Sequence, residues 1–437
     1  MKAFTMKTIK FNIWLLGLIA MVCGAMTSCS DDDLGPSIFD ATYHPLDRSL
    51  YSFPLDSFVE VNYREPYNIR FIYKMEDIGT NMNYNLVPVD YQKAVKFAVL
   101  GKYLWYDVYK KEVGDEFLKK YTPHIIQLIG SPAYNANSGT EVLGTAEGGL
   151  KITLYKGNEL DETSIDSLNE YFFRTMHHEF SHILHQNVII PTSFRAISNG
   201  QYNAMNWQET ADSIALSRGF FLQYASSGYE EDWVELIANY ITRTDDQWKA
   251  YLNTANYGWE VDTIPAERYT RSLGVNTMSY SLQQYKKLIK QMQRQGRVNF
   301  DSIGYRLFTG DVNSEGGGLA SYVVVRKQIQ RNADGYPALD QDGKMVYLDS
   351  DGINGRSVLE QKFGIIKEWL KTNFNYDIDK VHKEVQRRQY VVNDDGTYKL
   401  DANGDPINAL MQPSSTDPSR TVMDVLLDGV NQYKALQ

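Results

Sequence analysis

The stretch Met176-His177-His178-Glu179-Phe180-Ser181-His182-Ile183-Leu184-His185 contains the pattern H-E-x-x-H. Four of the seven histidines in the 437-residue chain fall within it. Positions i and i+4 of a helix lie on one face, so His178 and His182 can bind the same metal ion. Glu179 follows the first histidine, where its carboxylate can reach a water on the metal. The stretch therefore predicts a helix that carries a catalytic metal site.

The residues before this motif predict a strand followed by a helix. Residues 150–155 form the clearest strand pattern, and we expect this strand to be an edge to which an extended peptide can add. Ser164 can cap the next helix, with Asp166 in its first turn, and Pro191 is expected to stop it. The apolar stripe of this helix consists of Leu168, Phe172, Met176 and Ile183.

The remaining sequence predicts an α+β fold with a small sheet and the active-site helix, followed by a mostly helical C-terminal part with hairpin insertions. The expected strands are residues 69–73 and 124–129. The expected helices are residues 91–118 with a break at Gly101, residues 207–224, residues 230–240, residues 320–330 and residues 357–372. Asp-Gly pairs predict tight hairpins within residues 332–352 and 393–404. Calcium binding by these acidic loops is the alternative, but Ile353 does not fit the EF-hand template that would start at Asp349.

The N-terminus has the features of a targeting segment. Lys2, Lys7 and Lys10 precede an apolar run, residues 13–26, that is short for a membrane span. The following Met26-Thr27-Ser28-Cys29 resembles a bacterial lipobox, which implies cleavage before Cys29 and acylation of that residue. The other cysteine, Cys23, leaves with the signal, so we expect no disulfide. The predicted parts are a signal peptide (1–28), a tether (29–60), a catalytic domain (61–310) and a helical C-terminal region with acidic hairpin loops (311–437).

The third metal ligand is not supplied by the motif itself. A metzincin would have glycine at position 185 and a histidine at position 188, where this sequence has His185 and Val188. His185 lies about 10 Å along the helix from His178, too far for one tetrahedral ion, and is expected to pack or to bind a carboxylate behind the site. His177 points away from His178.

A glutamate from a later segment is the remaining possibility, and two candidates exist. Glu209 lies in a sequence similar to the E-x-x-A-D signature of some gluzincins, with its acidic partner one position early. Glu231 lies 49 residues after His182 and has Glu235 on the same helical face, where that carboxylate can orient a ligating imidazole. We favour Glu231 and retain Glu209 as the alternative.

Two resemblances add to this interpretation. Tyr224, Glu231 and Glu235 are spaced as in the gluzincin domain of lethal-factor-type toxins, which implies a zincin-like core and a tyrosine that stabilises the tetrahedral intermediate. The lipobox, residues 177–186, Trp207 and residues 219–235 together resemble the Bacteroidetes family of zinc metallopeptidase lipoproteins, described as substrate-import-associated zinc metallohydrolases. This resemblance covers about residues 140–390. It implies an outer-membrane lipoprotein encoded near SusC/SusD-type importers. The stretch Ser30-Asp31-Asp32-Asp33 after Cys29 resembles the surface-export signal of Bacteroidetes lipoproteins, so we expect exposure on the cell surface. The histidine motif predicts one zinc ion.

The sequence thus predicts a surface-anchored zinc metallopeptidase, connected with nutrient import, that acts on peptides or proteins, glycoproteins among them. A net charge of −10 argues against a nucleic-acid partner. One alternative is a non-catalytic substrate-binding lipoprotein of a SusC/SusD-type complex. Another is a glycan-binding lipoprotein in which Trp105, Trp248 and Trp259 stack on sugars, although isolated tryptophans are more often part of the core.

Overall fold

The computed structural model describes residues 46–75, 84–134, 141–142, 144–147, 150–256, 259–265, 302–308, 319–327, 329–343, 345–346, 353–402 and 404–437. The predicted signal peptide, the lipobox with Cys29 and the loop 349–352 lie outside the described residues. Within the described part, no helix is both long and apolar enough to cross a membrane.

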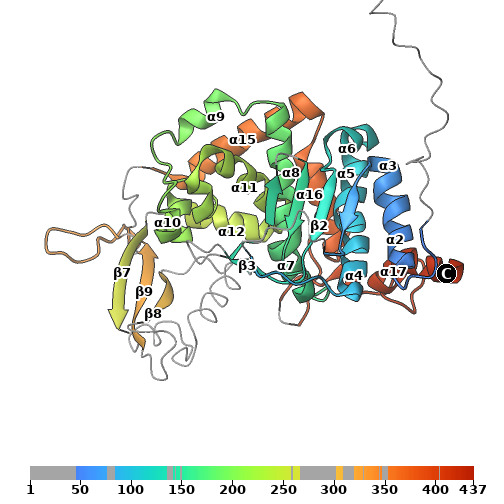
Figure 1. The fold of residues 1–437 in the computed structure, drawn as a ribbon. Coiled ribbons are helices and arrows are strands. Elements are labelled where there is room, and N and C mark those ends of the chain that lie inside the picture. The colour runs from blue at the N-terminus through green and yellow to red at the C-terminus, as the bar shows by residue number, and fades with distance from the viewer. Residues whose placement is uncertain are drawn as a thin grey trace, which may run out of the picture. The chain divides into compact units, whose positions relative to one another are not determined.

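Helices are the main elements of the described chain (Figure 1). The α-helices are α2 (Phe53–Val59), α3 (Glu65–Tyr67), α4 (Tyr91–Gly101), α5 (Asp107–Glu112), α6 (Asp115–Tyr121), α7 (Ile165–Leu168), α8 (Arg174–Asn187), α9 (Thr192–Ile197), α10 (Asp212–Ser217), α11 (Tyr229–Thr242), α12 (Asp245–Ala255), α15 (Gly355–Phe374), α16 (Ile378–Gln389) and α17 (Val422–Asn431). The strands are β1 (Arg70–Ile72), β2 (Ile125–Leu128), β3 (Ala133–Tyr134), β4 (Glu141–Val142), β5 (Gly144–Glu147), β6 (Lys151–Leu154), β7 (Trp259–Pro265), β8 (Ser302–Phe308) and β9 (Leu319–Lys327). This mixture confirms the α+β class. In Figure 1, β2 lies among the helices, and β7, β8 and β9 lie to one side.

The main sheet has the strand order β1-β2-β6-β5. The β1/β2 and β2/β6 pairs are parallel, with Ile126 opposite Ile152, and β5 runs antiparallel to β6. The three predicted strands β1, β2 and β6 are therefore confirmed. The expectation that residues 150–155 form an edge is wrong, because β5 pairs with their free side and becomes the edge itself. β7, β9 and β8 form a separate antiparallel sheet.

The helix that carries the histidines follows β6, as predicted. The Ser164 hydroxyl accepts a hydrogen bond from the Ser167 amide, and α7, a π-helical turn (Asn169–Phe173) and α8 follow without interruption. The helix ends at Asn187, and Pro191 caps the start of α9 instead of stopping α8. α8 lies close to β5: a Cβ on Gly144 would lie 2.3 Å from the Thr175 methyl group. Glycine at position 144 thus lets the helix approach the edge strand.

Three expectations about secondary structure need correction. Gly101 does not break its helix; it provides room for the Tyr63 hydroxyl, and the break comes at Gly114, whose φ of +119° favours glycine. Residues 207–224 do not form one helix, because Gly219 and Leu222 take positive φ and only α10 is helical over more than one turn. Residues 320–330 contain the strand β9, whose run Val323-Val324-Val325 favours a strand.

The other predicted elements are confirmed. α11 and α15 match the helices expected at residues 230–240 and 357–372. The Asp-Gly segments form tight turns, with Gly335, Gly343, Gly396 and Gly404 all at φ near +80°. At the other end of the fold, α17 packs against α2 and α4, and the Gln437 side chain donates to the Leu50 carbonyl at 2.8 Å.

Candidate metal centre

Two antiparallel helices, α8 and α11, face each other with residues spaced four apart. The facing positions on α8 are Arg174, His178 and His182, and those on α11 are Asn239, Glu235 and Glu231. Residues spaced four apart share one helical face, so basic side chains of α8 meet acidic and amide side chains of α11 along the contact. This pairing brings residues together that are about 50 positions apart in sequence.

The structure gathers His178, His182 and Glu231 at one end of this contact. Glu231 Oε2 lies 3.2 Å from His178 Nε2 and 3.4 Å from His182 Nε2. One potential ligand atom from each residue lies within 4.8 Å of the other two, and this is the grouping of metal-ligand residues found in the described part of the chain. Glu209 is not in the group; it is exposed on a short 3-10 turn, Trp207–Glu209.

The donor atoms fit a zinc ion. Glu231 Oε2 is buried and has no well-formed hydrogen bond. The other ring nitrogens of both histidines already have partners, so Nε2 is the nitrogen that each ring presents toward Glu231 and could offer to an ion. Two imidazole nitrogens and one carboxylate oxygen are the protein ligands of many catalytic zinc sites, and they leave one position open. A cation between them would satisfy the orphaned oxygen.

Glu235 contacts His178 on the side of the ring that faces away from Glu231. Its Oε1 lies 2.9 Å from His178 Nδ1, while Oε2 accepts from Asn239 at 2.7 Å and from Arg174 at 3.2 Å. Burial acts to raise the pKa of Glu235, but Arg174 and His178 outweigh it and lower the pKa to about 2. The sequence suggested Glu235 for this position; it did not suggest Arg174 or Asn239, although both stand four residues from a proposed site residue.

His182 has a different partner, the imidazole of His185. The distance from His182 Nδ1 to His185 Nε2 is 2.8 Å, and the ring planes are inclined at 67°. Burial lowers the pKa of His185 to about 4, and the charge of His182 acts in the same direction. We expected His185 to pack or to contact a carboxylate; the structure places it against the His182 imidazole instead.

The charges of His178, His182 and Glu231 suit a site that binds a cation. Burial acts to lower the pKa of His178, but Glu231 and Glu235 outweigh it and raise the pKa to about 10. Burial acts to raise the pKa of Glu231, but His178 and His182 lower it well below its usual range. Without a metal, a proton on His178 therefore compensates the two carboxylates.

Glu179 and Tyr224 border the same group. Glu179 is 8% exposed, and burial raises the pKa of its carboxyl group, although His178 and His182 oppose the shift. The Tyr224 ring lies against the His178 ring, with centroids 6.1 Å apart and planes inclined at 29°, and Trp207 packs edge-on against Tyr224 at 4.8 Å. Burial and the neighbouring carboxylates raise the pKa of Tyr224, so its hydroxyl stays protonated and can donate.

His177 belongs to the core, not to the site. It is fully buried, its Nδ1 lies 2.9 Å from the Tyr109 hydroxyl, and burial lowers its pKa to about 3. Trp105 is also fully buried beside it, at 6.3 Å between ring centroids. Trp105 therefore cannot offer a ring to a sugar, and Trp248 packs between Phe221 and Tyr240.

A buried ion pair fixes the first turn of α11, next to Glu231. Asp232 and Lys362 of α15 are both 0% exposed, and the Lys362 ammonium donates to Asp232 at 2.6 Å and to the Gly219 carbonyl at 2.7 Å. The Tyr202 hydroxyl donates to the same carboxylate at 2.9 Å. Helix α15 and the segment around Tyr202 are thus tied to the residue that follows Glu231.

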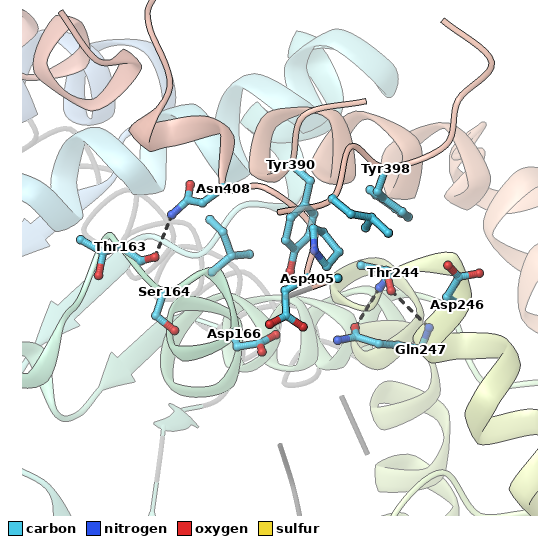
Figure 2. Close-up of a pocket in the computed structure, with 14 residues that line it drawn as sticks. Thr163, Ser164, Asp166, Thr244, Asp246, Gln247, Tyr390, Tyr398, Asp405 and Asn408 are labelled. Atoms are coloured by element: carbon cyan, nitrogen blue, oxygen red, sulfur yellow. Dashed lines mark hydrogen bonds between the residues drawn. The ribbon is translucent and has the colours of Figure 1, made fainter. Parts of the chain in front are cut away.

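A cavity of about 370 Å³ lies between the start of α7, the start of α12 and the hairpin of residues 390–408 (Figure 2). Its wall includes Asp166, Asp246, Asp405, Tyr390 and Tyr398. Asp166 and Asp246 stand in the first turns of their helices, where negative charge stabilises the helix. None of the gathered metal-ligand residues lines this cavity.

Comparisons with known proteins agree with this geometry. A family model described as "Putative zinc-binding metallo-peptidase" matches residues 50–379. The chain is similar to a crystal structure from Bacteroides caccae that carries the same description, with 27% sequence identity and a TM-score of 0.50, over 79% of this chain and 95% of that chain. No curated protein matches.

Proposed function

Because this chain belongs to the zinc-binding metallo-peptidase family, we propose that it hydrolyses peptide bonds with one zinc ion held by His178, His182 and Glu231. The family resemblance drawn from the sequence is confirmed by the family model and by the Bacteroides structure. The observation that carries the proposal is the convergence of three ligand atoms across α8 and α11, with a buried Glu231 oxygen that has no other partner. A zincin-like core of the gluzincin type is part of this proposal.

In this proposal Glu179 is the general base. Zinc, when bound, polarises the attacking water and the substrate carbonyl. Glu179 takes a proton as the water oxygen bonds to the carbonyl carbon, and gives it to the amine nitrogen as the C–N bond breaks. Burial raises the pKa of this carboxyl group toward the pH range in which such a base works.

Tyr224 and Glu235 have supporting roles in the proposed reaction. The Tyr224 hydroxyl donates to the oxygen that gains negative charge when the carbonyl is attacked. Glu235 accepts the Nδ1 proton of His178 and so directs the Nε2 lone pair of that ring toward the ion. The edge strand β5 lies against α8 and offers unpaired backbone groups to an extended peptide.

The location of the enzyme is proposed from the sequence. We infer that acylated Cys29 anchors the chain to the outer membrane, exposed on the cell surface, beside a SusC/SusD-type importer. Substrates would then be peptides or proteins, including glycoproteins, outside the cell.

The direct test is metal content and proteolysis by the purified chain. We expect about one zinc per chain, and cleavage of casein that a chelator abolishes and added zinc restores. The Glu209→Gln variant should keep both zinc and activity, whereas Glu231→Gln should lose both. A chain that retains zinc but cleaves neither casein nor glycoproteins would favour the non-catalytic binding lipoprotein.

A further inference from the structure

The two proposed histidine ligands have different kinds of partner on their second ring nitrogens. His178 Nδ1 faces the Glu235 carboxylate, which Arg174 and Asn239 also hold. His182 Nδ1 faces another imidazole, with His185 Nε2 at 2.8 Å. His185 follows His182 by three residues on α8, so the same helix supplies the ligand and its partner.

A contact of 2.8 Å between two ring nitrogens requires one proton between them. If His182 gives its Nε2 lone pair to a metal, its proton must sit on Nδ1. His185 Nε2 must then accept, and the proton of His185 sits on its own Nδ1. Of the two proton placements that the contact allows, only this one leaves Nε2 of His182 free to bind an ion.

We propose that His185 is a positioning residue that holds His182 in the metal-binding tautomer and orientation by accepting the Nδ1 proton of His182. The inference rests on the proposed zinc site. His182 has a side-chain exposure of 15%, so without His185 its ring could bond water instead and rotate or exchange tautomers. Loss of such an outer partner typically weakens metal binding by about 10- to 100-fold.

The tautomer can be read without any metal. We would label the metal-free full chain with ¹⁵N-histidine and record long-range ¹H–¹⁵N spectra, with His182 identified by substitution. The expected result is a proton on Nδ1 of His182. A bare Nδ1 on His182, with the ring proton on Nε2 alone, would overturn the proposal. Failure of the chain to bind zinc would instead contradict the proposed function, since the tautomer is measured independently.

Two variants then separate positioning from simple packing. His185→Gln places a side-chain carbonyl oxygen near the former Nε2 and can still accept, whereas His185→Leu keeps similar bulk and cannot. Competition with a chelating dye should show that His185→Leu binds zinc about 10- to 100-fold more weakly and that His185→Gln binds close to wild type. Gln186→Leu, an exposed change on the same helix, is the matched control. Equal losses in the Leu and Gln variants, or no loss in either, would refute the role.

Discussion

The affinity for zinc should depend on pH even at pH values far above the range in which histidine usually titrates. In the metal-free protein, Glu231 and Glu235 raise the pKa of His178 to about 10 against the effect of burial. Zinc binding needs the Nε2 lone pair and must displace this proton. Between pH 7 and about pH 10, the association constant should therefore rise about tenfold per pH unit, or about 1.4 kcal/mol. An unperturbed histidine, with a pKa near 6.5, would give a flat profile above about pH 7.5.

The stability of the metal-free and zinc-bound forms should respond differently to pH. The pKa of His178 is higher in the metal-free fold than in the unfolded chain. The protonated residue therefore stabilises the metal-free fold fully below about pH 6.5, and this contribution is lost as the pH rises toward 10. Over the same interval His178 leaves the stability of the zinc-bound form unchanged, because this residue is deprotonated both in the zinc-bound fold and in the unfolded chain. The difference in melting temperature between loaded and metal-free protein should therefore widen with pH.

The assay is calorimetric titration of metal-free chain with zinc at pH 7.5 in buffers of different ionisation enthalpy. The buffer dependence gives the number of protons released, and we expect about one from His178. Glu235→Gln removes one of the two raising carboxylates, so its affinity profile should level off at lower pH. A profile that is flat from pH 7.5 to 9, with no proton released, would refute the assignment of His178 as a protonated residue between two carboxylates.

Three further predictions follow from other parts of the molecule. Glu179→Gln should keep zinc and lower turnover by about 10²- to 10⁴-fold, because the base is removed and the ligands remain; undiminished casein cleavage by the zinc-loaded variant would contradict the role of Glu179. Lys362→Met should lower the free energy of unfolding by about 3–5 kcal/mol, measured with denaturant, because Asp232 would stay buried and charged without its partner. The double variant Asp232→Asn with Lys362→Met should recover much of that loss, and a double variant as unstable as the single one would argue against an unpaired charge as the cause. Cys29→Ala should move the protein from the membrane fraction to the soluble fraction and abolish labelling by a fatty-acid analogue; retained labelling would show that the lipid, if any, is attached elsewhere.

The sequence was most informative where a local spacing decides the geometry. His178 and His182 share a helical face at any position in a fold, and the same spacing links Glu231 to Glu235, so both halves of the site could be predicted. One further step of four residues along each helix leads from His178 to Arg174 and from Glu235 to Asn239, so the same spacing could have predicted these two residues. The choice between Glu209 and Glu231 needed the fold, because nothing local shows which segment α8 packs against.

Other features depend on contacts between distant segments. The pair Asp232–Lys362 joins residues 130 positions apart, and no pattern in the sequence indicates that a lysine of α15 is buried. The strand at residues 150–155 was recognised, but its place inside the sheet depends on β5, a four-residue strand that contains a glycine. β9 was mistaken for a helix because a short apolar run fits either structure until its neighbours are known.

The packing of α17 has a consequence for synthesis of the chain on the ribosome. Phe58 of α2 lies against Gly429 of α17, where an added Cβ would be only 3.1 Å from the phenylalanine ring. The apolar side of α2 is therefore covered by a segment that is made about 370 residues later. During translation this apolar surface stays exposed until about 370 further residues have been made, because its contact with α17 spans a large sequence separation. Nascent chains arrested before α17 should accordingly bind chaperones at residues 53–59, and chains long enough for α17 to fold should not bind them there.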